Sequence, residues 1–237
     1  MVYLLYLLGF APSIVWLIFY LRKDAHPESN RMILKIFFYG MLSALAAIVL
    51  EKSFSFLLAK TFLKNQIFLY SVLTIFIGGA LIEEYLKYIV IRFKVLKNSE
   101  LDEAFDVFLY MIISALGFAA LENILLLINY STPALAEKVV WLMISRFVFA
   151  TFLHGLCSGL LGIFLCFSFF HLKNKNVIFM AGLLLATLFH GFYNFSIIKI
   201  QSVENFVLPL IILAFAAFLV FLGMKKIKKL KSICVAR

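Results

Sequence analysis

Long apolar stretches alternate with short polar segments along the whole of this 237-residue chain. Most of these stretches approach or exceed the roughly 20 residues that an α-helix needs to cross the hydrocarbon core of a bilayer. The pattern predicts about seven transmembrane helices, at residues 2–21, 32–50, 67–91, 105–128, 139–170, 177–198 and 206–224. The fifth stretch is too long for one straight crossing, so we expect its first part, up to Arg146, to lie at the membrane interface.

The composition agrees with this pattern, since 65% of the residues are hydrophobic, 14% are charged and the mean hydropathy is +1.06. These values are far from those of a soluble domain. They predict an all-α integral membrane protein that crosses the cell membrane several times, with residues 1–237 in a single membrane domain. Within it we expect a core at about 67–198, accessory helices at 1–50 and 206–224, and a basic tail at 225–237.

The net charge of +10 comes from lysine and arginine in the loops and the tail. If the amino terminus lies outside, the segments that then lie inside carry most of these residues, so the positive-inside rule predicts the amino terminus outside and the carboxyl terminus inside. The basic residues form no face that is interleaved with exposed aromatics. We therefore expect the lipid bilayer, and no nucleic acid, as a partner.

Three charged residues interrupt the third apolar stretch, namely Glu83, Glu84 and Lys87. Each charge in a transmembrane segment costs roughly 2.5–3.5 kcal/mol, so such residues must face the protein interior and have partners. Glu83 and Lys87 are four residues apart and share a helix face, which predicts an ion pair. Glu84 is rotated by about 100° around the helix axis from Glu83. Nothing in its own segment is expected to satisfy it, so its partners should come from other helices.

Further polar groups lie in the fourth, fifth and sixth stretches, which contain Glu122, His154, and His190 with Asn194. Counted from the inner ends of their helices, Glu122, His154 and His190 lie within roughly 10 Å of the depth of Glu83. Two carboxylates and two imidazoles in one layer favour a functional site over scattered packing polarity. His190 and Asn194 are four residues apart, so both project from one helix face.

The polar residues occur in four short motifs: Glu83-Glu84-x-x-Lys87, Gly117-Phe118-Ala119-Ala120-Leu121-Glu122-Asn123, His154 followed by small residues, and His190-Gly191-x-Tyr193-Asn194. In this order, over residues 78–194, the combination resembles the PrsW family of intramembrane proteases. That family is related to the type II CAAX prenyl proteases and to bacteriocin-processing or immunity proteins. In those relatives a histidine usually stands four residues after the phenylalanine. Here Glu122 stands there, which favours the PrsW branch.

The resemblance implies hydrolysis of a peptide bond within or next to the membrane, with membrane-anchored anti-sigma factors as the substrates, cut to start a stress response. It assigns catalytic roles to Glu83, Glu84, Glu122, His154, His190 and Asn194, and supporting roles to Lys87, Phe118 and Asn123. Glu83 or Glu84 would act as the general base on water. His154, oriented by Glu122, would deliver a proton to the leaving amine. His190 and Asn194 would donate hydrogen bonds to the oxyanion.

Three alternatives stay open. We expect a water activated by glutamate alone, with no cofactor, but zinc held by His154, His190 and a carboxylate such as Glu122 or Glu83 is the competing mechanism. The sequence contains no His-Glu-x-x-His motif for zinc. A proton-coupled transporter or channel would use the same residues as a relay, although no inverted repeat is apparent. A binding or immunity protein without catalysis is the third alternative.

Overall fold

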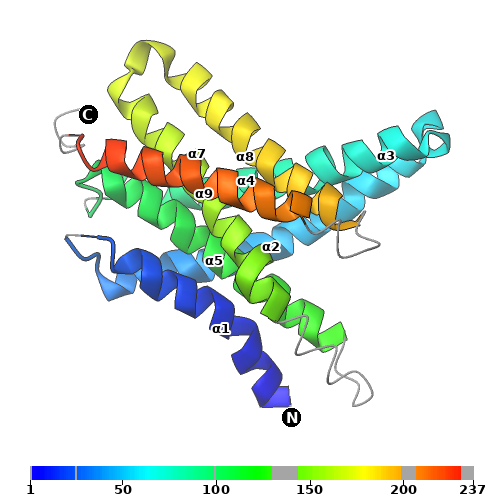
Figure 1. The fold of residues 1–237 in the computed structure, drawn as a ribbon, viewed down its shortest axis with the longest axis horizontal. Coiled ribbons are helices and arrows are strands. Elements are labelled where there is room, and N and C mark those ends of the chain that lie inside the picture. Colours follow the sequence, from blue (N-terminus) through cyan, green and yellow to red (C-terminus); the bar gives the residue numbers. More distant parts are fainter. Residues whose placement is uncertain (1, 25, 99, 130–143, 199–206, 231–237) are drawn as a thin grey trace.

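The computed structural model describes residues 2–24, 26–98, 100–129, 144–198 and 207–230, and in these ranges it contains helices and turns but no strand. The α-helices are α1 (Val2–Leu21), α2 (Asn30–Ala59), α3 (Ile67–Leu73), α4 (Ile82–Lys94), α5 (Ala104–Asn129), α7 (Thr151–Phe170), α8 (Lys175–Ile198) and α9 (Val207–Ile227) (Figure 1). Two short 3₁₀-helices, η1 (Phe62–Asn65) and η5 (Leu172–Asn174), lie in turns. Two π-helical segments, η2 (Thr74–Leu81) and η4 (Arg146–Ala150), run directly into α4 and α7.

Six helices of the described ranges are long and apolar enough to cross a membrane: Asn30–Ala59, Ile67–Lys94, Ala104–Ile128, Arg146–Phe170, Leu172–Ile198 and Val207–Ile227. The remaining helix, α1, has a shorter apolar stretch at Leu7–Leu21. The prediction of an all-α protein that crosses the membrane several times is therefore confirmed. The orientation in the membrane stays a prediction, and the expected interfacial start of the fifth helix, at residues 139–143, lies outside the described residues.

Polar side chains fix where two of these helices begin. Ser29 precedes α2, and its hydroxyl accepts a hydrogen bond from the backbone N–H of Met32 at 3.2 Å. Near the start of α5, the carboxylate of Asp106 accepts hydrogen bonds from the backbone N–H groups of Asp102 and Glu103. Both contacts satisfy backbone donors that a helix start otherwise leaves without a partner.

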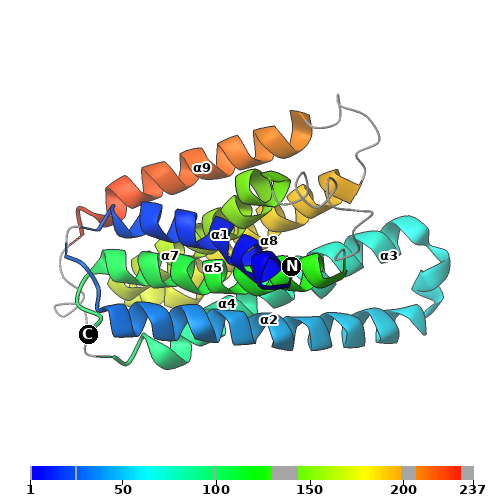
Figure 2. The ribbon, with the colours of Figure 1, turned by 90° about the horizontal axis from the view of Figure 1, so that it is seen from below.

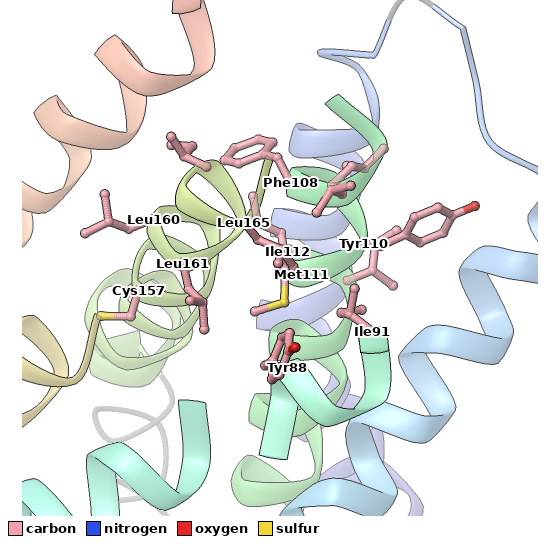
Figure 3. Packing of buried hydrophobic residues seen from close by; sticks show 14 of the residues in the cluster. Tyr88, Ile91, Phe108, Tyr110, Met111, Ile112, Cys157, Leu160, Leu161 and Leu165 are labelled. Carbon is pink, nitrogen blue, oxygen red and sulfur yellow. The ribbon is translucent and has the colours of Figure 1, made fainter. Parts of the chain in front are cut away.

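α5 and α7 form the centre of the bundle and are its most buried helices (Figures 1 and 2). α5 packs against α1, α2 and α7, while α7 also packs against α8 and α9. The close-up in Figure 3 shows Phe108 and Met111 on α5, at its packing contact with α7. On α7, Gly159 and Gly162 lie directly against the same α5 side chains. Small residues at such positions let two transmembrane helices approach closely.

α2 crosses α5 at a place where the two backbones touch. A Cβ atom added to Gly117 would lie 2.0 Å from the carbonyl oxygen of Phe37, and one added to Gly40 would lie 2.2 Å from that of Ser114. No side chain fits at either position. This crossing therefore fixes α5 against α2 little more than one turn before Glu122.

Replacing Gly117 by alanine should destabilise the folded protein by about 1–3 kcal/mol, because the added methyl group must displace a neighbouring backbone. Thermal unfolding of the purified protein in detergent measures this effect. Gly79→Ala is the matched control, since its added Cβ meets nothing closer than 3.7 Å. Equal melting temperatures for the two variants would show that the α2–α5 crossing is looser than described.

Candidate active site

A fully buried ammonium lies at the centre of the polar cluster. Nζ of Lys87, on α4, donates to Oε1 of Glu84 at 2.8 Å and to Oε2 of Glu83 at 3.3 Å, and lies 2.8 Å from Nδ1 of His154. It also lies 4.3 Å from the centre of the Phe118 ring. The predicted pair between Glu83 and Lys87 is confirmed. Because a buried charge is costly unless it is paired, these partners are what allow the lysine to lie here.

Glu84 is fully buried and has three polar partners. Besides Lys87, it accepts a hydrogen bond of 2.6 Å from the Ser158 hydroxyl on α7, and it lies 2.9 Å from Nδ1 of His190 on α8. The expectation of partners on other helices is confirmed. The expectation that its own segment offers none is wrong, because the side chain of Lys87 is long enough to reach both carboxylates.

The two imidazoles, of His154 and His190, have equivalent surroundings, since each ring lies beside one carboxylate. Nε2 of His154 lies 2.8 Å from Oε2 of Glu122, just as Nδ1 of His190 lies beside Glu84. The rings meet edge to face, with their centroids 5.0 Å apart. The remaining nitrogens, His154 Nδ1 and His190 Nε2, lie 3.7 and 3.8 Å from the same oxygen of Glu83. Each ring is thus held by one carboxylate and turns its other nitrogen towards Glu83.

This arrangement suits a metal ion. Glu83, His154 and His190 are buried, and one ligand atom from each lies within 4.8 Å of the other two. Two imidazole nitrogens and one carboxylate oxygen are a sufficient set for catalytic zinc with an open position. Hydrogen bonds from the far side of each imidazole to a carboxylate are the usual support for such ligands. The donors present therefore fit zinc, with Glu83 as the carboxylate and Glu122 behind His154.

Glu122 and Arg146 form the accessible side of the cluster. Nη2 of Arg146 lies 3.1 Å from Oε2 of Glu122, and its Nε donates to Oδ1 of Asn123. The side chains of Glu122 and Arg146 are 31% and 19% exposed, whereas those of Glu83, Glu84, Lys87, His154 and His190 are at most 8% exposed. Asn123 also donates to Gly9 and Thr151, so it ties α5 to α1 and α7.

Asn194 and Phe118 have different surroundings. Asn194 is half-buried on α8, one helical turn after His190, and its side chain makes no hydrogen bond to the described residues. Its amide is therefore free to donate to a ligand. Phe118 is buried, and its ring covers Lys87 and lies 5.7 Å from the His154 ring, which makes it an apolar wall of the cluster.

Three residues near the cluster were not among the predicted site residues. Ser158 stands four residues after His154, so its place on the same helix face could have been found from spacing. Arg146 was assigned to the interface, which hid its contact with Glu122. Glu51, a half-buried residue of α2, lies close enough for its charge to interact with Glu83 and Glu122.

Carboxylates, imidazoles and an ammonium lie together on four helices of a membrane bundle and are accessible from one side. These are the groups that intramembrane hydrolases use to activate water. Residues 28–223 match the PrsW family intramembrane metalloprotease model, so the chain belongs to this family. It is accordingly a peptidase and a multi-pass membrane protein. This family membership favours the peptidase over the transporter or channel alternative.

The chain is similar to curated proteins named Protease PrsW. It is 28% identical to that of Oceanobacillus iheyensis over 86% of this chain and 88% of the relative. It is 30% identical to that of Geobacillus kaustophilus over 78% of this chain and 76% of the relative. For the Bacillus subtilis protein the identity is 26%, over 86% of this chain and 87% of the relative. No solved structure matches the chain.

Replacing Lys87 by methionine should destabilise the protein by about 3–5 kcal/mol, because it leaves two buried carboxylates without their shared cation. Thermal unfolding in detergent tests this expectation. Lys87→Arg, which keeps the charge, should lose less stability. A methionine variant that unfolds at the wild-type temperature would show that Lys87 does not neutralise Glu83 and Glu84.

Proposed function

We propose that this protein is an intramembrane endopeptidase that uses a metal ion held by Glu83, His154 and His190. The convergence of these three donors, with a carboxylate behind each imidazole, is the observation that carries the proposal. The description of the family as metalloproteases supports it. Zinc is the ion that this donor set suits.

A bound zinc would polarise the scissile carbonyl and make a water molecule more acidic at neutral pH. The side chains around it then divide the remaining work. Glu84 already has three partners and serves to hold His190. Glu122 lies behind His154, on the side of the ring away from the ion, so it serves to hold His154 in the same way.

Two donors can serve the developing oxyanion. The Asn194 amide makes no hydrogen bond to the described residues. The Arg146 guanidinium has five N–H donors, of which its contacts with Glu122 and Asn123 use only a part. Donors that are held in place before the reaction stabilise charge that develops in the transition state. Arg146 also keeps Glu122 beside His154.

The substrate that we propose is a membrane-anchored protein, of the anti-sigma-factor kind to which the motifs point. A transmembrane helix satisfies its own backbone hydrogen bonds, so a peptide bond within it is shielded from attack. The substrate segment must therefore unwind where it meets the accessible side at Glu122 and Arg146. A site next to the end of the substrate helix meets this requirement most easily.

Hydrolysis by a glutamate-activated water without metal is the second candidate. One observation favours it: the Lys87 ammonium already lies 2.8 Å from Nδ1 of His154 and 3.3 Å from Glu83, beside two of the three donor atoms. In this arrangement the lysine is the countercharge of Glu83, and Glu83 acts as the general base.

The two candidates are distinguished by metal content and cleavage, measured on one preparation. The full-length protein is purified, its bound metal is measured, and it is reconstituted with a single-span substrate. We expect about one zinc per chain, with both zinc and cleavage lost in Glu83→Gln, His154→Ala and His190→Ala. The matched control is His171→Ala, because His171 is an exposed histidine just after α7.

The two mechanisms predict opposite results with a strong chelator. Cleavage that stops on chelation and returns with zinc supports the metal mechanism. Wild-type protein that is free of metal and still cleaves would contradict it and leave Glu83 as the base. Retention of zinc by all three variants would show that the ion binds elsewhere in the chain.

Asn194→Ala should lower kcat by about 10²–10³, the usual cost of removing one oxyanion donor, with unchanged metal content. The measurement is the single-turnover rate of substrate cleavage. Asn174→Ala, at an exposed position in η5, is the control. An unchanged rate in Asn194→Ala would show that this amide does not contact the oxyanion, and loss of metal would point to a structural role instead.

A further inference from the structure

A groove of about 420 Å³ lies between α1, α7 and α9. Its walls are almost entirely apolar, with Trp16 from α1, Phe152 and Leu156 from α7, and Val220 from α9 among the lining residues. Trp16 stacks on Phe152, with their ring centroids 4.3 Å apart. Because α1 and α9 lie on the outside of the bundle, this groove faces the membrane.

The groove is separate from the candidate active site. Phe152 and Leu156 stand two residues before and two residues after His154, and at 100° per residue both point away from it. No residue that lines the groove belongs to the polar cluster. α7 therefore presents His154 to one side and the groove to the other.

Two lysines lie at one end of the groove, where α1 and α9 end. Nζ of Lys23 lies 4.9 Å from the centre of the Phe19 ring, and Nζ of Lys225 lies 4.3 Å from that of Phe221. Both rings line the groove. Within the described part of the chain, neither lysine forms an ion pair with a carboxylate. Lys228 donates to the carbonyl oxygen of Lys23, which ties the two helix ends together.

We propose that this groove binds an anionic phospholipid, with an acyl chain between α1 and α9 and the phosphate at Lys23 and Lys225. An apolar groove with unpaired cations at one end complements an amphiphile with an anionic head. Basic pockets between transmembrane helices bind lipid head groups in this way. The ring faces below the two ammoniums hold them in place while their charges stay available.

The size of the groove favours a lipid over a helix of a second protein. A helix with its side chains is about 10 Å across and rises about 5.4 Å per turn, so a volume of 420 Å³ holds only about one turn. An acyl chain is thin and flexible, and it can follow such a narrow space. The proposal depends only on the membrane location of the chain and not on its peptidase activity.

Quenching of Trp16 fluorescence tests the proposal directly. The chain has two tryptophans, so Trp141→Phe leaves Trp16 as the reporter inside the groove. The variant is reconstituted in phosphatidylcholine vesicles that contain brominated phosphatidylglycerol or, at the same mole fraction, brominated phosphatidylcholine. We expect stronger quenching by phosphatidylglycerol.

The charge of the two lysines and the space for the acyl chain are then tested separately, each in the Trp141→Phe variant. Lys23→Gln with Lys225→Gln should lower the preference for phosphatidylglycerol by roughly fivefold per lysine. Lys173→Gln with Lys175→Gln, two exposed lysines at the turn between α7 and α8, should not change it. Ala217→Phe, in the groove wall, should reduce quenching by both lipids, whereas Ala214→Phe, at an exposed position of the same helix, should not.

Three results would overturn the proposal. Equal quenching by the two brominated lipids would show that no head-group site exists. Unchanged quenching in Ala217→Phe would show that the acyl chain lies outside the groove. Quenching that falls as the protein-to-lipid ratio rises would show that a helix of a second copy occupies the groove instead.

Discussion

The structure depends on the burial of one ammonium group. Lys87 lies inside a membrane bundle with no exposed side-chain surface, and a charge in such a place is tolerated only with closely placed partners. Glu83 and Glu84 supply opposite charge from the same helix, while His154 comes from α7. Because Glu84 also needs His190 and Ser158, neutralising this lysine brings α4, α7 and α8 together. The cluster is thus a packing requirement as well as a chemical site.

Close backbone packing holds the helices that carry the remaining groups. Gly117 brings α5 against the backbone of α2, and Gly159 and Gly162 bring α7 against α5. Glu122 on α5 and His154 on α7 can therefore meet at 2.8 Å on two helices that are fixed against each other. A hydrolytic site needs such rigidity, because its donors must be placed before the reaction starts.

The sequence allowed the helices and the common depth of the polar residues to be predicted, but not the detailed pairing. Hydropathy located the transmembrane helices, although α2 continues past residue 50 to Ala59 because polar residues there do not interrupt the helix. Helical spacing identified the pair of Glu83 with Lys87. The pair with Glu84 was missed because only the separation of four residues was considered, although residues three apart on a helix are also neighbours. The role of Arg146 was missed as well, because the length of the fifth apolar stretch placed this residue at the membrane interface. Arg146 instead lies in a π-helical segment that runs directly into α7.

Both π-helical segments end shortly before a cluster residue, since η2 ends two residues before Glu83 and η4 ends four residues before His154. In η4 the carbonyl oxygen of Phe147 accepts a hydrogen bond of 3.0 Å from the Trp16 indole of α1. The neighbouring residue, Arg146, binds Glu122. Two contacts of η4 therefore set the position of this arginine. One is with Trp16, which lines the groove, and the other is with Glu122 of the polar cluster. The outer helix α1 contributes no residue to the polar cluster, yet through Trp16 it helps to define the accessible side of the site.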